Sequence, residues 1–568
     1  MKHTFSAQNP TQQYISIQFE FDCNSETTLV QLASWRPGRY ELGNFAKNVK
    51  GFKVFNEAGK ILDVEKVTKD CWQIDTTNSN SVKILYQYYA TDLNAGSTYL
   101  SKDQLYVNPV NCCLYVVGQE HQPIEVQLEI PETFEIAAPL PREGNRLFAK
   151  NYDELADSPF ICSAQLQHNA YVVENVKFNI WFNGEVKVNW EKLISDFTQF
   201  TTKQIKTFTE FPVEEYHFFF QIVPYRAYHG VEHLNSTVIL LGPSYDIFEG
   251  AYADLLGVSS HELYHAWNVK AIRPIEMFPY DFTKENYSKL GYLCEGVTTY
   301  MGDLHLYKSG VFSFSDYKRE LATQLQKHFD NFGRFQYSVA ESSFDTWLDG
   351  YAPGAPNRKV SIYTEGCLLA FVTDIFIAEH SKDRCHLDDV MRCLYFDFYL
   401  KGKGISEADY QNTIAQFAGR RMDEIFADFF YGTKNFESLL TKAFDYLGLE
   451  ITHKPVASYS AAKLGFKSIP QGPNFVAKAI YPGSPAELGG MMLEDEIIAV
   501  NSYATNGDMD RWLTYFDNDI KTLTISRKGR LMELSLPEVN RFFYVEYGIQ
   551  ELEKPNTAQR QAFDSWSK

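Results

Sequence analysis

The spacing of apolar residues changes along this chain, and that change constrains the fold more than any other feature of the sequence. In YISIQFEFDC (14–23) and IEVQLEIP (124–131), apolar and polar residues alternate. A period of two is typical of half-buried strands in an antiparallel sheet. Across 190–211 the apolar residues instead recur on one face of a helix. The sequence therefore predicts a sheet region followed by a helical one.

A chain of 568 residues is too long for one hydrophobic core, so we expect several domains of mixed α+β class. Residues 1–168 are predicted to form an antiparallel β domain. Residues 169–447 contain strands that lead into helices. Residues 448–540 form a compact region of short strands with Gly/Pro turns, and residues 541–568 are predicted to be a polar C-terminal tail.

The charge of the chain excludes one class of partner. There are 53 basic and 72 acidic residues, a formal charge of −19. Nucleic-acid binding needs clustered Lys and Arg, so we expect no nucleic-acid partner. A net negative charge mildly favours cationic ligands such as peptide amino termini.

The cellular location is predicted from the cysteines and from apolar stretches. The nine cysteines are scattered and form no CxxC pair, which indicates a reducing compartment. No stretch reaches the roughly 18 apolar residues that cross a bilayer, and no signal-like segment opens the sequence. We therefore expect a cytoplasmic protein without a membrane partner; a periplasmic location stays open if a leader has been removed.

The stretch VSSHELYHAWNVKAIRP (258–274) carries the strongest chemical signal. His261 and His265 are four residues apart, so on a helix both imidazoles lie on one face and can bind a single ion. Glu262 follows the first histidine, where its carboxylate can reach a water without binding the ion. A helix from Ser259 to Trp267 is expected. The alternative is a structural helix on which three polar residues share a face by chance.

A catalytic zinc usually has three protein ligands and one open position. Glu295 is a lone carboxylate in the apolar stretch GYLCEGV (291–297). A buried acid is costly without a partner, and a bound metal is one such partner; an ion pair with an arginine is the alternative. Two histidines and a glutamate suit one Zn²⁺ per chain. Thr299, one turn beyond Glu295, is a hypothetical orienting partner for a ligand histidine.

These two stretches, SSHELYHAWNVKAIRP and LCEGVTTYMGDL, together resemble the glycyl aminopeptidase family of zinc metallopeptidases, peptidase family M61. The resemblance implies an N-terminal β domain and a C-terminal PDZ domain. Between them it implies a thermolysin-like (gluzincin) catalytic domain, with a mixed sheet and helices.

Two further segments resemble the same family and imply site residues. GVEHLNSTVI (230–239) implies that Glu232 binds the α-amino group of the substrate, which sets cleavage one residue in. For His233, a substrate contact and a structural hydrogen bond are both open. VSIYTEGCLLAF (360–371) implies that Tyr363 donates to the oxyanion, although Glu365 stands where the family commonly has lysine.

Residues 463–540 resemble a PDZ domain. The resemblance implies that the loop Leu464, Gly465 and Phe466 binds the C-terminal carboxylate of a peptide added as a strand. The alternative is a PDZ fold that only packs against the catalytic domain.

The function predicted from these residues is zinc-dependent removal of N-terminal residues from peptides with a free amino group. Glu262 is the predicted general base. A preference for glycine and alanine is implied by the resemblance alone. Two alternatives stay open: an endopeptidase of the same fold, which would not need Glu232, and a non-catalytic PDZ-type adaptor that binds peptides.

Overall fold

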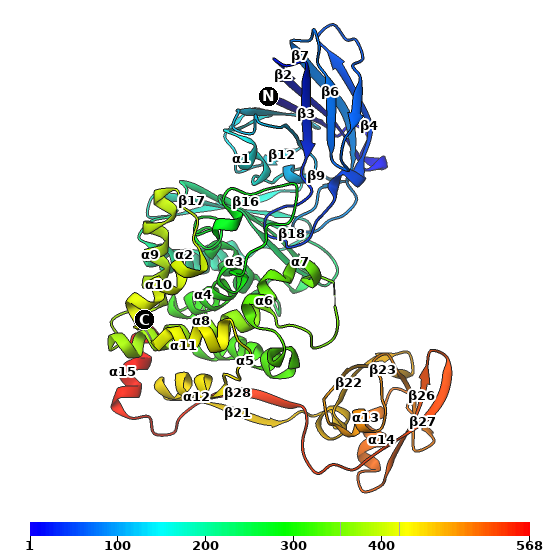
Figure 1. Ribbon diagram of the computed structural model, residues 1–568, viewed down its shortest axis with the longest axis vertical. Coiled ribbons are helices and arrows are strands. Elements are labelled where there is room, and N and C mark those ends of the chain that lie inside the picture. Colours follow the sequence, from blue (N-terminus) through cyan, green and yellow to red (C-terminus); the bar gives the residue numbers. More distant parts are fainter. Residues whose placement is uncertain (353, 420) are drawn as a thin grey trace. The chain divides into compact units, whose positions relative to one another are not determined.

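The structure is a computed structural model that describes residues 1–352, 354–419 and 421–568. It divides into two units (Figure 1). Unit 1 comprises Met1–Tyr317, Phe332–Tyr446 and Ala558–Lys568, and unit 2 comprises Lys318–Asn331 and Leu447–Thr557. Within the described residues, no helix combines the length and the apolar character needed to cross a bilayer.

The N-terminal part of unit 1 consists of sheets, as the period of two predicts. The two alternating stretches become β2 (Tyr14–Asp22) and β11 (Ile124–Glu129), and their apolar side chains face the core. The seven-stranded sheet has the order β13 (Arg142–Glu143), β14 (Arg146–Ala149), β11, β1 (Lys2–Ser6), β2, β7 (Ser81–Tyr89), β4 (Val49–Asn56). One four-stranded sheet has the order β10 (Leu114–Val116), β3 (Thr27–Leu32), β6 (Cys71–Asp75), β5 (Val64–Lys66). A second has the order β12 (Glu135–Ala137), β15 (Phe160–Ser163), β9 (Gln104–Val107), β8 (Tyr99–Leu100).

One pairing in this region differs from the antiparallel prediction. β1 pairs parallel with β11, while its other neighbour β2 is antiparallel. A parallel pair needs a long connection, and the many residues between β1 and β11 provide one. Short helical turns connect the strands: η1 (Pro10–Gln12), η2 (Phe45–Asn48), η3 (Pro109–Asn111) and α1 (Tyr152–Ala156).

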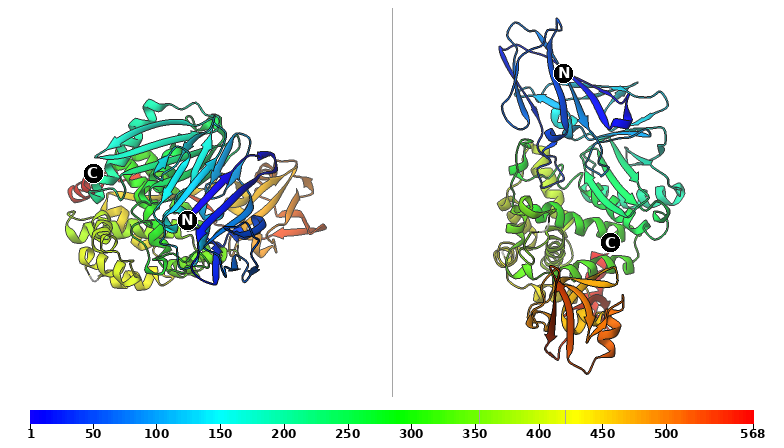
Figure 2. Two further views of the ribbon diagram at one scale, coloured as in Figure 1. Left: turned by 90° about the horizontal axis from the view of Figure 1, so that it is seen from above. Right: turned by 90° about the vertical axis from the view of Figure 1, so that its right-hand side faces the viewer.

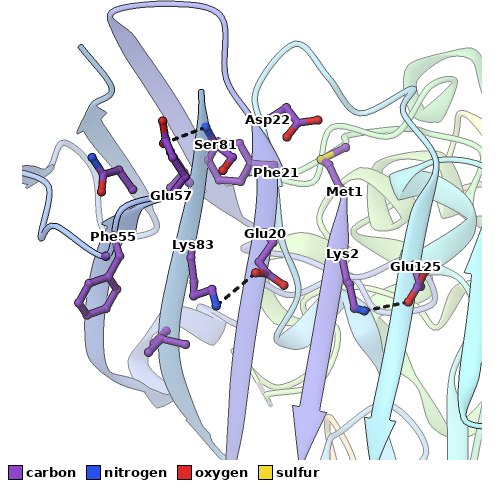
Figure 3. Close-up of a pocket in the computed structure, with 14 residues that line it drawn as sticks. Met1, Lys2, Glu20, Phe21, Asp22, Phe55, Glu57, Ser81, Lys83 and Glu125 are labelled. Atoms are coloured by element: carbon purple, nitrogen blue, oxygen red, sulfur yellow. Dashed lines mark hydrogen bonds and ion pairs between the residues drawn. The ribbon is translucent and has the colours of Figure 1, made fainter. Parts of the chain in front are cut away.

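A hollow lies over β1, β2 and β7 of the seven-stranded sheet (Figure 3). Four of its charged side chains form two ion pairs: Lys2 Nζ is 3.0 Å from Glu125 Oε1, and Lys83 Nζ is 3.4 Å from Glu20 Oε1. These pairs are exposed, so each contributes little to stability. Two of the acidic side chains that line this hollow are thus neutralised by lysines of the same sheet.

A mixed five-stranded sheet follows, with the order β16 (Gln167–Val173), β17 (Val176–Asn183), β18 (Glu215–Ile222), β20 (Ser236–Gly242), β19 (Ala227–Glu232). β17, β18 and β20 are parallel, and β16 and β19 are antiparallel edge strands. The predicted helical face becomes α2 (Trp190–Phe208), which connects β17 to β18. Figure 2 shows this sheet between the N-terminal sheets and the helices.

Helices form the rest of unit 1, which confirms the predicted α+β architecture. The longest, α8 (Ile362–Ser381), is buried along nearly its whole length, as expected for a helix that is apolar all round. The others are α3 (Tyr252–Tyr264), η6 (Tyr292–Val297), α4 (Thr298–Lys308), α6 (Val339–Phe344), α7 (Thr346–Asp349), α9 (Leu387–Asp397), α10 (Glu407–Ala418), α11 (Arg421–Ile425), η9 (Phe426–Phe430), α12 (Glu437–Tyr446), and the short turns η4 (Ser244–Asp246), η5 (Ile275–Met277), η7 (Phe332–Phe335), η8 (Tyr399–Lys401). Helix α5 (Phe314–Asp330) begins in unit 1 and continues in unit 2.

The structure differs from the prediction of a polar tail over 541–568. These residues include β28 (Val545–Glu551), which pairs with β21 (Leu449–Pro455), and α15 (Thr557–Trp566). Trp566 is buried, and its indole N–H donates to the Tyr300 hydroxyl at 3.0 Å. Because most residues of this segment are polar, the sequence did not reveal that one face of α15 is apolar and buried.

Trp566 is part of a closed hydrogen-bond network in the core of unit 1. Tyr300 donates to Asp374 Oδ2 at 2.5 Å, and the Leu387 amide donates to Asp374 Oδ1 at 2.8 Å. His386 Nδ1 is 3.3 Å from the same Oδ1. We call Tyr300, Asp374, His386 and Trp566 the Asp374 network.

Unit 2 contains a second sheet, with the order β22 (Phe466–Gln471), β23 (Asn474–Ile480), β24 (Glu496–Val500), β26 (Lys521–Arg527), β27 (Arg530–Leu536); β25 (Tyr503–Ala504) pairs with β24. Its helical elements are η10 (Ser460–Leu464), α13 (Pro485–Leu488) and α14 (Met509–Tyr515). The core of this unit includes Leu464, Phe466, Ile497 and Leu523.

Candidate metal centre and active site

The two histidines lie at the C-terminal end of α3, not near its start as the sequence suggested. The helix begins at Tyr252, includes His261 and ends at Tyr264, and His265 keeps helical backbone angles as its C-cap. The four-residue spacing therefore still places both rings on one face. Glu295 lies in η6, a π-helical turn that leads directly into α4. Such turns are frequent at functional sites.

The ligand atoms of these three residues converge on one point. His261 Nε2 and His265 Nε2 are 3.0 Å apart, and Glu295 Oε2 is 3.8 Å from the first and 3.4 Å from the second. Atoms bound tetrahedrally to zinc at about 2.1 Å lie about 3.4 Å from one another. The three observed distances bracket that value, so the side chains present fit a single zinc ion.

Hydrogen bonds fix His265 for binding through Nε2. Its Nδ1 lies 2.6 Å from the Asn268 carbonyl oxygen, so Nδ1 carries the proton and Nε2 keeps its lone pair for an ion. The Asn268 side-chain amide donates to the Leu293 carbonyl at 2.9 Å and to Thr298 Oγ1 at 3.0 Å. Asn268 thus ties the end of α3 to the segment that carries Glu295.

Thr299 does not take the role hypothesised for it. Its hydroxyl donates to the Glu295 carbonyl oxygen at 2.8 Å and is therefore occupied within its own helix. The neighbouring Thr298 hydroxyl lies 3.5 Å from His265 Nδ1 and donates to the Cys294 carbonyl at 2.7 Å. The π-helical turn before Thr298 changes which residue faces α3.

The electrostatics of the centre favour a cation. Burial opposes the charged form of His265, but Glu295 and the carboxylates of Glu232 and Glu262 raise its pKa to about 10. Burial also opposes the charge of Glu295, but His265 and His261 hold its pKa at about 2. Two imidazoles and three acidic side chains thus share one buried space.

Glu262 is buried beside the ligand set. Burial, together with the charges of Glu232 and Glu295, raises the pKa of Glu262 well above its ordinary value. Its Oε2 is buried and has no hydrogen-bond partner among the described residues. On the other side, β19 passes so close that a Cβ at Gly230 would lie 2.1 Å from Glu262 Oε1. A glycine is required there for the strand to approach this carboxylate.

Glu232 lies at the end of the edge strand β19. It is 5% exposed, and oxygens of Glu232 and Glu262 with a nitrogen of His265 lie within 4.8 Å of one another. Its carboxylate makes no hydrogen bond with any residue that the structure describes. We call His261, Glu262, His265, Glu295 and Glu232 the histidine–glutamate cluster.

His233 points elsewhere and has a structural hydrogen bond, one of the two roles left open for it. Its Nδ1 is 3.0 Å from Asp157 Oδ1, which also accepts from Lys270 Nζ at 2.8 Å. The lysine and the histidine outweigh the effect of burial and hold the pKa of Asp157 well below its ordinary value. These contacts connect Asp157, just after α1, to the end of β19 and to the segment that follows the paired histidines.

Tyr363 is the second residue of α8 and is 37% exposed. The surrounding protein and the charges of Glu295 and Glu232 raise the pKa of Tyr363 well above its ordinary value. The hydroxyl therefore keeps its proton and remains a hydrogen-bond donor. Glu365, the residue that departs from the family pattern, is buried in the same helix.

The predicted peptide loop of unit 2 has a mainly structural environment. Leu464 and Phe466 are core residues, and Phe466 pairs with Ile480 of β23. The Gly465 amide already donates to the Ser460 carbonyl oxygen.

The sequence analysis assigned no role to one turn of the N-terminal region, Trp35–Tyr40. Tyr40 donates from its hydroxyl to Glu295 Oε1 at 3.3 Å. A Cβ at Gly38 would lie 2.6 Å from Glu232 Oε2. A usable signal was present, since WRPGRY concentrates aromatic and cationic side chains around a Pro-Gly turn.

Comparison with known proteins identifies two parts of the chain. Residues 2–164 match the Peptidase M61 N-terminal domain, and residues 254–369 match the M61 glycyl aminopeptidase model. No curated protein matches the sequence. An aminopeptidase N family protein from Idiomarina loihiensis shares 25% identity and has a TM-score of 0.91, with both chains covered over 100%.

An M1 zinc metallopeptidase from Deinococcus radiodurans has a TM-score of 0.48 at 11% identity, covering 76% of this chain and 94% of its own. The first model covers most of the predicted N-terminal β domain, and the second includes His261, His265 and Glu295. Over these two regions the chain is similar to the M61 family of peptidases.

Proposed function

We propose that this protein is a zinc-dependent aminopeptidase that removes N-terminal residues, above all glycine and alanine, from peptides with a free amino group. One observation carries the proposal. Three ligand atoms lie 3.0 to 3.8 Å apart, as a single tetrahedral ion requires, and the carboxylate of Glu232 lies beside them without a hydrogen-bond partner among the described residues. A thermolysin-like catalytic region over 169–447 is part of this proposal; α3 packing against β19 and β20 supports it.

His261, His265 and Glu295 would hold one Zn²⁺ per chain, which supplies Lewis-acid activation of the scissile carbonyl and of the attacking water. Glu262 accepts the proton of that water and later delivers it to the leaving amine, a role that its raised pKa suits. Tyr363 donates a hydrogen bond to the developing oxyanion. Glu232 binds the α-ammonium group of the substrate, so that the first peptide bond lies at the reacting position.

The test combines metal analysis with turnover of glycyl and alanyl reporters by the wild type and Glu262→Gln. We expect about one zinc per chain in both proteins. The rate should fall by about 10²- to 10⁴-fold in the variant, the typical contribution of a general base. Protein that hydrolyses these reporters equally well after complete metal removal would contradict the proposal.

The endopeptidase alternative is separated by Glu232→Ala. An aminopeptidase variant should lose activity on free-amine peptides and gain none on N-terminally blocked ones. An endopeptidase would cleave blocked peptides both before and after the substitution.

Unit 2 supports the adaptor as a second candidate function. A hollow between β22 and α14 is lined by Lys467, Ser468, Phe475, Met509 and Arg511, in the place where a PDZ-like domain would add a peptide strand. Leu464, Gly465 and Phe466 are the proposed carboxylate loop. The adaptor becomes the better description if metal-loaded protein fails to hydrolyse a library of unblocked dipeptide reporters but binds peptides through unit 2.

A cytoplasmic location remains a prediction.

A further inference from the structure

We propose that Tyr40, from the N-terminal β region, is a positioning residue of the metal centre that holds Glu295 in the orientation required for ligation. The inference rests on the proposed function, because it assigns to Glu295 the role of a metal ligand. It makes the N-terminal region a contributor to the centre rather than a neighbouring domain.

The two oxygens of Glu295 have separate partners. The Tyr40 hydroxyl donates to Oε1 at 3.3 Å, whereas Oε2 faces His265 Nε2 at 3.4 Å and His261 Nε2 at 3.8 Å. A carboxylate free to rotate presents either oxygen, or both, to an ion. With Oε1 bound to a hydroxyl, Glu295 presents Oε2 alone.

Tyr40 is fixed by contacts from the catalytic region. It is 6% exposed and packs with Met277 and Ile362, the residue before Tyr363. Its ring meets Trp347 edge-on, with centroids 5.9 Å apart at 88°. Its backbone amide donates to the Tyr351 hydroxyl at 3.3 Å.

The turn that carries Tyr40 is shaped to reach the site. Gly38 has φ +81°, a conformation that favours glycine, and its Cα lies against the Glu232 carboxylate. Arg36 is buried, and its guanidinium covers Gly96, where a Cβ would lie 2.1 Å from Cζ. The turn is therefore held on both sides of the Pro-Gly pair, and the position of Tyr40 follows from it.

Outer partners of metal ligands typically change metal affinity by about 10- to 100-fold when they are lost. Tyr40→Phe removes one oxygen and keeps the ring that packs on Trp347. Tyr86→Phe is the matched control: Tyr86 is also buried in the N-terminal region, and its hydroxyl donates to the Cys112 carbonyl at 2.6 Å, away from the metal centre. Both changes remove a buried hydroxyl from a hydrogen bond.

The experiment measures the zinc dissociation constant of the full chain by competition with a chromophoric chelator, and the visible spectrum of the cobalt-substituted protein. We expect Tyr40→Phe to bind zinc at least about tenfold more weakly and to change the cobalt spectrum. We expect Tyr86→Phe to keep both within error, although each variant loses some thermal stability.

If Tyr40→Phe fails to fold, a ring-fluorinated tyrosine at position 40 keeps every contact and strengthens the donor; a changed cobalt spectrum is then the expected result. Wild-type affinity and spectrum in the position-40 variant would overturn the inference. Wild-type protein that binds neither metal would instead overturn the proposed function, so the two failures are distinguishable.

Discussion

Two buried polar clusters of unit 1 differ in how completely they are satisfied. In the Asp374 network, one carboxylate receives a tyrosine hydroxyl, a backbone amide and a histidine, and the tyrosine accepts from Trp566. In the histidine–glutamate cluster, three carboxylates face two imidazoles. There, Glu262 Oε2 is buried and has no hydrogen-bond partner in the described part of the chain. Buried polar groups are normally paired, so a closed network indicates structure and an open one indicates a missing ligand.

The comparison predicts that Asp374 matters for folding alone. Asp374→Ala should lower the free energy of unfolding by about 3–5 kcal/mol, because it leaves the buried Tyr300 hydroxyl and the partly buried His386 without their acceptor. Chemical denaturation measures this change. Asp397→Ala is the control: Asp397 pairs with Lys401 at the surface, and its loss should cost less than about 1 kcal/mol. An equal loss of unfolding free energy in both variants would contradict the structural importance assigned to the Asp374 network.

The open cluster should gain stability from an ion, and the closed one should not. A free zinc concentration of about a thousand times the dissociation constant should raise the free energy of unfolding of the wild type by about 4 kcal/mol. Glu295→Gln should lose most of this gain, since it replaces a ligand carboxylate with a neutral amide. Thermal unfolding with and without zinc checks the prediction, and an undiminished zinc effect in the variant would contradict it.

Tyr363 belongs to neither cluster, and the role proposed for its hydroxyl is a contact with the reacting substrate alone. Tyr363→Phe should therefore lower kcat by about 10²- to 10³-fold, with little change in KM, zinc content or stability. Steady-state kinetics on an alanyl reporter measures this split. Tyr171→Phe, which removes a hydroxyl bonded to Thr201 in the sheet region, should keep kcat. A kcat of Tyr363→Phe within twofold of the wild type would assign the oxyanion role elsewhere.

The smallest effect concerns the pH dependence of the closed network. Burial opposes the charged form of His386, but Asp374 raises the pKa of His386 above its ordinary value. A raised folded-state pKa contributes stability below the unfolded value of about 6.5, and this contribution is lost as pH rises through the folded value. His386→Asn should therefore cost about 1 kcal/mol more at pH 6 than at pH 9. Unfolding measured at both values tests the sign, and a larger cost at pH 9 would contradict it.

Local patterns in the sequence predicted the parts of the fold that depend on neighbouring residues. The alternation in β2 and β11 marks strands because every second side chain faces the core. The histidines of α3 and the lone acid Glu295 were recognisable because each stands in a short, chemically distinctive stretch. The parallel pairing of β1 with β11 was not predictable, since nothing local records which distant strand lies alongside.

The missed features have physical reasons as well. Helical spacing pointed to Thr299, but a π-helical turn precedes it, and Thr298 takes the position next to His265. The polar composition of 541–568 concealed the buried side chains of Ala562 and Trp566. Tyr40 contacts Glu295 from a turn far upstream in the chain, and a single sequence does not indicate which distant residues lie close together.

The placement of α15 has a consequence for biosynthesis. Unit 2 is inserted between α12 and α15, so the last helix of the chain returns to complete unit 1. Until residues beyond Thr557 have been synthesised, the Trp566 indole that donates to Tyr300 is absent. Tyr300 lies in α4, the helix that directly follows the turn with Glu295. The Asp374 network can therefore be completed only after the whole of unit 2 has been synthesised.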